Sequence, residues 1–320
     1  NINVVTTVSA SDVDQNASLS YSLTGGADRT LFQIQPLSGL LSFTSAPDYE
    51  NRLDADLNGI YEVTVQVSDG SLTDTQTLYV TVVDVNETPT DVSLSGASVA
   101  ENQPAGTFIG SFSTTDPDAG NTFTYQLVTG EGSTDNSRFE ISGNALSAKE
   151  TFDFETKTSY SIRVRSTDQG GLSTETSFTI QITNVNEAPT SIWYDGLTID
   201  ENMPVDSTAA LFGASDPDAG ALFSFTLVSG SGDADNGSFH FSGSTLLSSA
   251  VFDYETQKIY FIRVRVTDQG GLTNEQSFAI TINDLNEPPV DMALSNGHVA
   301  ENQPAGDEVG TLSSSDPDAD

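Results

Sequence analysis

The 320-residue sequence contains no cysteine. This absence excludes disulfide bonds, thiol chemistry and zinc sites built on cysteine ligands. A secreted protein made of small domains then needs another means of stabilisation, and a bound metal ion is one such means.

Basic residues and long apolar runs are also scarce. Ten lysines and arginines stand against 46 acidic residues, which gives a formal net charge of −36. Nucleic acid or an anionic membrane surface would therefore be repelled, and neither is expected as a partner. No run of 18 apolar residues occurs, so we expect no membrane insertion within this stretch.

Short segments of alternating hydrophobic residues are present in large number. The segment 160–165 reads YSIRVR and the segment 177–183 reads SFTIQIT, so that aromatic and branched residues share one face of an extended chain. No segment shows a convincing period of 3.6 residues. About seven such strands per hundred residues predict an all-β protein built of β-sandwiches. The 17 phenylalanines and 9 tyrosines at this spacing argue against the disorder that the charge alone would suggest.

The sequence repeats itself with a step of 100 residues. The segment 168–189 (DQGGLSTETSFTIQITNVNEAP) returns at 268–289 as DQGGLTNEQSFAITINDLNEPP. A period of this length fits whole domains in tandem. We expect copies at 1–87, 88–187, 188–287 and 288–320, of which the first lacks its opening and the last is cut short. The joints are short, acidic and proline-containing, which favours ordered junctions.

Acidic residues recur at fixed places in each copy. They form an xEN motif, a DxD motif, a DxE motif, an acidic linker and a lone acid after a strand. The xEN glutamates are Glu101, Glu201 and Glu301, and the lone acids are Asp69, Asp168 and Asp268. The DxD pairs are Asp12/Asp14, Asp116/Asp118, Asp216/Asp218 and Asp316/Asp318. The DxE pairs are Asp48/Glu50, Asp153/Glu155 and Asp253/Glu255, and the linkers carry Asp84/Asn86/Glu87, Asn184/Asn186/Glu187 and Asp284/Asn286/Glu287.

The spacing within the pairs suggests convergent carboxylates. Residues i and i+2 of an extended chain point the same way, so Asp153 and Glu155 would converge while Phe154 faces the core. In the DxD motif, Pro117 favours an extended Asp116 and would align the pair in the same manner. Calcium takes six to eight oxygen ligands, more than one motif supplies, but several motifs brought together at a junction would suffice.

In these motifs and their order the chain resembles the cadherin repeat family, and its VNEAPT-like linkers and DPDAG-like loops are most similar to the bacterial cadherin-like branch. The resemblance covers three copies and the fourth fragment. It implies tandem seven-stranded Greek-key β-sandwiches, related to the immunoglobulin fold, in an elongated rod.

The resemblance also implies up to three calcium ions at each junction, held by side chains and by linker carbonyls. For the first junction the implied ligands are Asp48, Glu50, Asp84, Val85, Asn86, Glu87, Thr88, Asp116, Asp118 and Asp168. For the second they are Glu101, Asp153, Glu155, Asn184, Val185, Asn186, Glu187, Ala188, Asp216, Asp218 and Asp268. For the third they are Glu201, Asp253, Glu255, Asp284, Leu285, Asn286, Glu287, Asp316 and Asp318. At the second junction Asn184 replaces the first aspartate of the linker, which predicts weaker binding of one ion there.

Other acidic motifs have simpler interpretations. The stretch Asp54-Ala-Asp56-Leu-Asn58-Gly59 matches the start of an EF-hand loop, but Val65 occupies the twelfth position and no flanking helices are evident, which favours a polar hairpin insertion. Asp233, Asp235 and Asn236 favour an Asx turn over an extra calcium turn.

No enzyme is expected. His240 and His298 lie in different copies, no nucleophile elbow, P-loop or zinc motif occurs, and carboxylate pairs that recur at every junction argue against a glycosidase. We expect an extracellular, cell-surface array that calcium makes rigid and that serves adhesion or forms the stalk of a large adhesin. Its partner would be another surface protein, the same protein or a polysaccharide. The alternatives are a polysaccharide-binding module and a passive spacer in a secreted multidomain enzyme.

Overall fold

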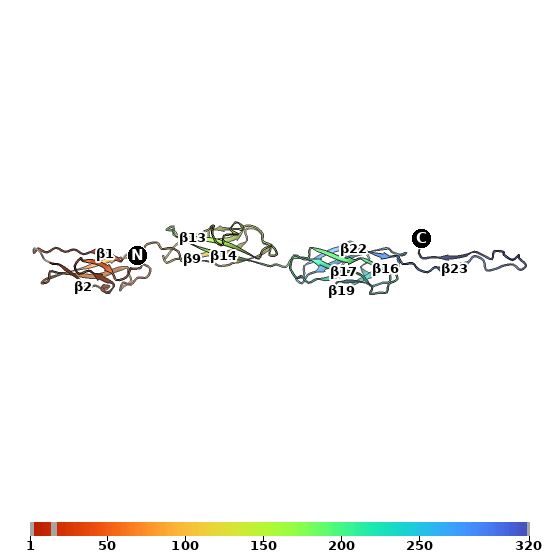
Figure 1. Ribbon diagram of the computed structural model, residues 1–320, viewed down its shortest axis with the longest axis horizontal. Coiled ribbons are helices and arrows are strands. Elements are labelled where there is room, and N and C mark those ends of the chain that lie inside the picture. The colour runs from red at the N-terminus through yellow and green to blue at the C-terminus, as the bar shows by residue number, and fades with distance from the viewer. Residues whose placement is uncertain (1–2, 14–17, 319–320) are drawn as a thin grey trace. The chain divides into compact units, whose positions relative to one another are not determined.

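The computed structural model describes residues 3–13 and 18–318. It divides into two compact units, Asn1–Asp153 with Lys157–Thr183, and Phe154–Thr156 with Asn184–Asp320. Both are built of β-strands, with single 3-10 turns as the helical elements among the described residues (Figure 1). The expected all-β class is thus confirmed.

The first unit holds two sandwiches in sequence (Figure 1). The strands of the first copy are β1 (Val4–Thr7), β2 (Ser20–Gly25), β3 (Phe32–Ile34), β4 (Leu40–Phe43), β5 (Ile60–Ser68) and β6 (Thr73–Thr81), with the 3-10 turn η1 (Arg29–Leu31). Those of the second copy are β7 (Asp91–Leu94), β8 (Ser98–Ala100), β9 (Phe108–Thr115), β10 (Thr124–Leu127), β11 (Phe139–Ser142), β12 (Ala145–Ala148), β13 (Ser159–Thr167) and β14 (Ser173–Thr183), with η2 (Asn136–Arg138).

The second unit repeats this plan. Its strands are β15 (Ser191–Gly196), β16 (Thr198–Asp200), β17 (Thr208–Ser215), β18 (Ser224–Leu227), β19 (Phe239–Ser242), β20 (Thr245–Ser248), β21 (Ile259–Thr267) and β22 (Thr273–Asn283), with η3 (Asn236–Ser238). The strands β23 (Val290–Leu294) and β24 (Leu312–Ser315) pair with each other in the final segment.

The first strand of a copy is divided between the two sheets of its sandwich. In the second copy, β7 runs antiparallel to β9 in the sheet β11-β12-β9-β7, whereas β8 runs parallel to β14 in the sheet β10-β13-β14-β8. The chain crosses at Gly96, where an added Cβ would lie 2.5 Å from the carbonyl oxygen of Ile109, so only glycine fits this close approach. The seven predicted strands therefore become eight segments in the second and third copies.

The cores follow the predicted alternation. In β13, every second residue is buried, including Ile162 and Val164, which are fully enclosed. Leu146 and Leu246 take the same place in the second and third copies and are also fully buried. Burial of such side chains contributes roughly 1.5–3 kcal/mol each, so the two inner faces hold each sandwich together. The sandwich framework leaves the acidic motifs on the loops at its ends.

Candidate metal centres

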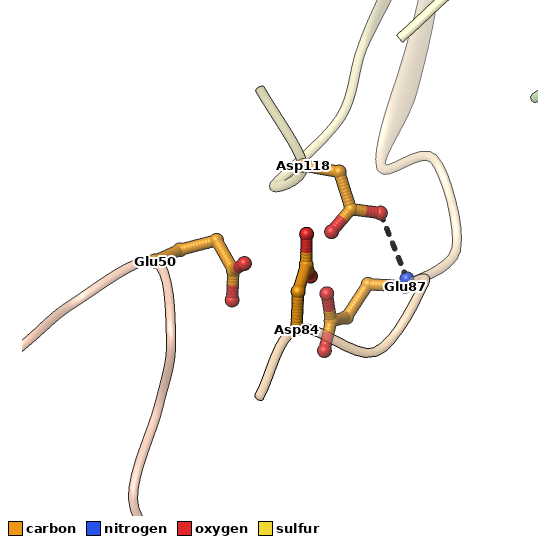
Figure 2. Close-up of side chains that lie close together, drawn as sticks. All are labelled: Glu50, Asp84, Glu87 and Asp118. Atoms are coloured by element: carbon orange, nitrogen blue, oxygen red, sulfur yellow. Dashed lines mark hydrogen bonds between the residues drawn. The ribbon is translucent and has the colours of Figure 1, made fainter. Parts of the chain in front are cut away.

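Four carboxylates converge at the first junction (Figure 2). Glu50 follows β4, Asp84 and Glu87 lie in the linker after β6, and Asp118 follows β9 of the next copy. One oxygen from each of the four lies within 4.8 Å of the others. The loops at the end of one sandwich, the linker and the start of the next sandwich therefore contribute to one acidic cluster.

Backbone hydrogen bonds hold this cluster in place. The N–H of Glu87 donates to Oδ2 of Asp118 at 2.9 Å, as Figure 2 shows, and the N–H of Asp118 donates to Oδ1 of Asp116 at 3.0 Å. The N–H of Glu50 donates to Oδ1 of Asp48 at 3.0 Å. Asp48 and Asp116 thus position the loops, while the residues two places further on point into the cluster.

The proximity of the carboxylates in this cluster changes their pKa values. A hydrogen bond with the Asp118 carboxylate, burial and the negative charges of Glu50, Asp118 and Asp84 raise the pKa of Glu87 to about 7. The backbone N–H of Glu87 stabilises the charged form of Asp118 and lowers its pKa, so the pair favours a proton on Glu87. Burial, with contributions from Asp48 and the charge of Asp84, raises the pKa of Glu50. A cation placed here would remove this repulsion.

The second unit contains an equivalent cluster at the third junction. Oxygens of Glu201, Glu255, Asp284 and Asp318 lie within 4.8 Å of one another. Glu201 is fully buried and accepts hydrogen bonds from the N–H groups of Tyr254 and Leu285, each at 2.8 Å. Burial raises the pKa of Glu255, and the negative charges of Glu201, Glu287 and Asp284 raise it further.

Both junctions contain buried carboxylate oxygens with no hydrogen-bond partner, in the clusters or in the motifs beside them. At the first junction these are Oε2 of Glu87, Oδ2 of Asp116 and Oδ1 of Asp118, and at the third they include Oε2 of Glu287 and Oδ1 of Asp318. Unpaired buried oxygens are costly unless a cation coordinates them. The donor set consists of oxygens and carries negative charge, which fits a hard divalent cation such as calcium.

The predicted ligands of the second junction are divided between the two units, Glu101 and Asp153 in the first and the others in the second. Within the second unit, the N–H of Glu187 donates to Oδ2 of Asp218 at 2.8 Å, as at the other junctions. In addition, Nδ2 of Asn184 donates to Oδ1 of Asp218 at 2.8 Å.

Two of the three lone acids pair with linker asparagines, whereas Asp69 accepts from the N–H groups of Ser71 and Leu72 in its own turn. Nδ2 of Asn86 donates to Oδ2 of Asp168 at 2.9 Å, and Asn186 and Asp268 form the same bond at 2.8 Å. The hydrogen bond from Asn86 and those from backbone N–H groups outweigh burial and lower the pKa of Asp168. Asp168 and Asp268 thus contact the linkers without joining the four-residue clusters, and their role as calcium ligands stays a prediction.

Two geometric expectations were wrong. The DxE motif is a turn over residues 254–256 and at the equivalent 154–156, so its acids do not alternate along an extended chain. Phe154 is only half-buried, and Phe152 fills the core instead. The DxD motif is likewise a bend, closed by the side chain of its own first aspartate. Side chain to backbone hydrogen bonds outweigh the extended preference of these short segments.

The sequence reasoning missed the role of the asparagine in the xEN motif. Asn102, Asn202 and Asn302 all have positive φ, between 58° and 66°, a conformation that asparagine adopts more readily than most residues. Nδ2 of Asn202 also donates to Oε1 of Glu287. The recurrence of asparagine after each glutamate was the available signal.

Two acidic motifs remain, the turn at residues 233–236 and the first DxD motif. Oδ2 of Asp233 accepts a hydrogen bond from the N–H of Gly230, and Oδ2 of Asp235 accepts one from the N–H of Phe261 in β21. Neither bond is the local contact of an Asx turn, so the Asx turn stays a prediction. Asp14 lies outside the described residues.

Comparison with known proteins identifies the family. Residues 2–83 and 95–183, more than half of the chain, match the cadherin domain. The chain belongs to the cadherin domain family. The predicted resemblance to cadherin repeats is therefore confirmed, and membership supports the expectations of an extracellular location and of a chain that is not an enzyme.

Relatives extend over nearly all of these cadherin repeats. Protein dachsous of Drosophila melanogaster is 31% identical over 335 residues, which cover 95% of this chain and 9% of dachsous. Protocadherin Fat 4 of Homo sapiens is 28% identical over 324 residues, which cover 96% of this chain and 6% of Fat 4. The chain thus spans less than a tenth of either relative.

Solved structures share the fold of these cadherin repeats. The extracellular domain of protocadherin gammaB4 has a TM-score of 0.68 at 21% identity, with 100% of this chain and 54% of that chain covered. Mouse cadherin-23 EC22-24 has a TM-score of 0.62 at 21% identity, with 88% and 92% covered. Among the described residues, no helix is long and apolar enough to cross a membrane.

Proposed function

We propose that this stretch is an array of extracellular cadherin repeats that binds calcium at its junctions and is made rigid by it. The observation that carries the proposal is the first cluster, in which Glu50, Asp84, Glu87 and Asp118 come from two sandwiches and the linker between them. The unpaired buried oxygens of Glu87 and Asp118 support a cation as the missing partner.

We propose the ligand sets given above for the three junctions, with up to three ions at each. Bound calcium would supply positive charge that cancels the repulsion within each set. Asp118 and Glu87 would act as the mechanical link, because the hydrogen bond between them joins a loop of the second sandwich to the linker. The dissociation constant of calcium from such extracellular modules is on the order of 10⁻⁴–10⁻³ M.

The predicted repeat boundaries at residues 87, 187 and 287 belong to the same proposal. They place each acidic linker between two copies, where ligands from both sides are within reach. The VNEAPT-like linker motifs and the DPDAG-like loop motifs support a bacterial cadherin-like branch, although the relatives above are animal proteins.

Adhesion, or presentation of an adhesive domain on a stalk, is the activity that we infer for the whole protein. Its partner would be another surface protein or a second copy. A polysaccharide remains the second candidate because Trp193, the only tryptophan, is 51% exposed on β15 with its ring packed over Gly213. Retention of the parent but not of Trp193→Ala on immobilised glycans would favour that candidate.

Calcium titration tests the main proposal. We expect the melting temperature and the maximum dimension from small-angle scattering to rise together with calcium. Asp118→Asn should require more calcium for both changes, because it removes a charge from the cluster. A chain whose dimension and melting temperature ignore calcium would contradict the proposal.

A further inference from the structure

The insertion before β5 in the first copy contains a buried carboxylate that the junctions do not use. Asp54 is only 2% exposed. Its Oδ2 accepts a hydrogen bond from the N–H of Gly59 at 3.1 Å, which turns the carboxylate across the loop. Its Oδ1 is buried and has no hydrogen-bond partner. Such an oxygen needs a donor or a cation, because burial removes its hydration.

Two further oxygen-bearing side chains follow at alternate positions of the same loop. Nδ2 of Asn58 donates to Oδ2 of Asp56 at 2.7 Å, and Oδ1 of Asn58 accepts from the N–H of Ile60 at 2.6 Å. The chain turns tightly here, with Leu57 at φ 57° and Gly59 at φ 81°. Ligand residues at positions one, three and five, with glycine at six, are the first half of a calcium-binding loop.

The other copies place a donor where the first copy has this loop. In the second copy, Nζ of Lys157 lies 2.5 Å from Oδ1 of Asp135. In the third copy, Nε2 of Gln257 donates to Oδ1 of Asp235 at 3.2 Å and to the carbonyl oxygen of Ile259 at 2.9 Å. An ammonium or amide group therefore serves the acidic residue at this place in the fold.

The first copy has the same acid but no such donor. Oδ1 of Asp28, the counterpart of Asp135, accepts instead from the N–H of Ala55 within the insertion at 2.7 Å. The insertion thus adds Asp54 and Asp56 near a buried carboxylate and removes the side chain that would balance it. The local charge becomes more negative, and no side chain among the described residues of the first copy takes the place of Lys157 or Gln257.

Arg52, the cation of the insertion, contacts backbone carbonyls and an aromatic ring rather than the carboxylates. Its Nε donates to the carbonyl oxygen of Tyr49 at 3.1 Å, its guanidinium carbon lies 4.4 Å from the centre of the Tyr49 ring, and its Nη1 reaches the carbonyl oxygen of Leu57 at 3.4 Å. Among the described residues, no ion pair joins Arg52 to a carboxylate.

We propose that this loop is a separate site for a hard divalent cation, with Asp54, Asp56, Asn58 and the carbonyl oxygen of Ile60 as protein ligands. Ile60 is the counterpart of Ile259, whose carbonyl oxygen accepts from a donor in the third copy. Water completes the shell, because Val65 at position twelve is buried and offers no carboxylate. The site shares no ligand with the first junction, so it adds a calcium to the first copy alone.

Ion counting on the intact chain tests this site. Equilibrium dialysis against saturating calcium should show one ion fewer per chain for Asp54→Asn with Asp56→Asn than for the parent. The junction variant Asp118→Asn serves as the control and should leave the loop ion in place. Equal ion counts for the parent and the double variant would overturn the site.

Hydrogen exchange on the same chain locates the ion. It also tests the site if the double variant fails to fold. Calcium should slow amide exchange over residues 52–60 in the parent and in Asp118→Asn. Asp56→Lys, which supplies an ammonium as Lys157 does, should slow exchange there without calcium and abolish the calcium response. Unchanged exchange over 52–60 in the parent on addition of calcium would contradict the proposal.

Discussion

Asn184 donates a hydrogen bond of 2.8 Å from its amide to Oδ1 of Asp218. The counterparts of this oxygen in Asp118 and Asp318 are buried and have no partner. At those two junctions the linker residue is Asp84 or Asp284, whose carboxylate cannot donate a hydrogen bond. One substitution thus converts an oxygen available to a cation into one occupied by an amide.

Asn184→Asp should therefore strengthen calcium binding at the site around Asp218. The change adds a negative ligand and frees Oδ1 of Asp218, so we expect roughly tenfold tighter binding, equivalent to about 1.4 kcal/mol. The calcium dependence of the melting transition measures it. The reciprocal variant Asp84→Asn is the matched control and should weaken the first junction. Equal midpoints for parent and Asn184→Asp would show that this oxygen binds no ion.

Glu87→Gln should have opposite effects with and without calcium. Because the folded chain raises the pKa of Glu87 from 4.5 to about 7, stability without calcium falls as pH rises from 4.5 to 7 and is level above that. The neutral glutamine variant should not show this fall in stability with pH. Above pH 7, in the presence of a chelator, its melting temperature should be higher than that of the parent. In calcium it should melt lower, because a ligand is missing.

Scanning calorimetry at several pH values tests this reversal. Glu140→Gln, which removes one charge from an exposed position of β11, is the control and should show no reversal. A Glu87→Gln variant that is less stable under both conditions would assign Glu87 an ordinary structural role.

Glu175→Gln should destabilise the second copy in a pH-dependent manner. The side chains of Arg165 and Arg163 hydrogen-bond Glu175 at 2.6–2.8 Å and lower its pKa below 4.5. Their stabilising effect is present above pH 4.5 and is lost as pH falls through the lowered pKa. The variant should melt below the parent at neutral pH, and the gap should close in acid.

The matched control for Glu175 is Glu150→Gln. Glu150 pairs with Arg138 at the surface, where ion pairs contribute about 0–1 kcal/mol. A constant gap between Glu175→Gln and the parent from neutral to acid pH would exclude the ion pairs as its cause.

Leu246→Ala should destabilise the third copy with or without calcium. Leu246 is fully buried between the two sheets, and loss of such a leucine costs about 2–5 kcal/mol because a cavity remains. Denaturant unfolding of the calcium-free chain measures the loss. Leu222→Ala, at a residue that is 73% exposed, should change stability by less than about 0.5 kcal/mol. Equal effects of the two substitutions would place Leu246 outside the core.

The strands were predictable because their signal is local. In β13 and β21, period-two alternation survives from sequence to burial pattern, and the 100-residue repeat transfers it from copy to copy. The division of the first strand was not predictable, because it depends on a backbone approach at Gly96 to a residue distant in sequence.

The candidate sites were predictable in composition but not in detail. The recurrence of the motifs identified Glu50, Asp84, Glu87 and Asp118 as neighbours, and the structure brings them together. The sequence could not show which carboxylates would accept hydrogen bonds from backbone N–H groups. Hydrogen bonding turns Asp48 and Asp116 back onto their own loops, and burial leaves Oδ1 of Asp54 without a hydrogen-bond partner. The bonds of Asp48 and Asp116 are local, because each side chain accepts from the N–H two residues further on, whereas the burial of Asp54 depends on tertiary context.

Anomalous diffraction from crystals of the chain grown with calcium tests the central claim most directly. The account predicts peaks at the first junction, with carboxylate oxygens of Glu50, Asp84, Glu87 and Asp118 about 2.3–2.6 Å from an ion. Density without such peaks, with these four side chains turned away from one another in saturating calcium, would contradict it.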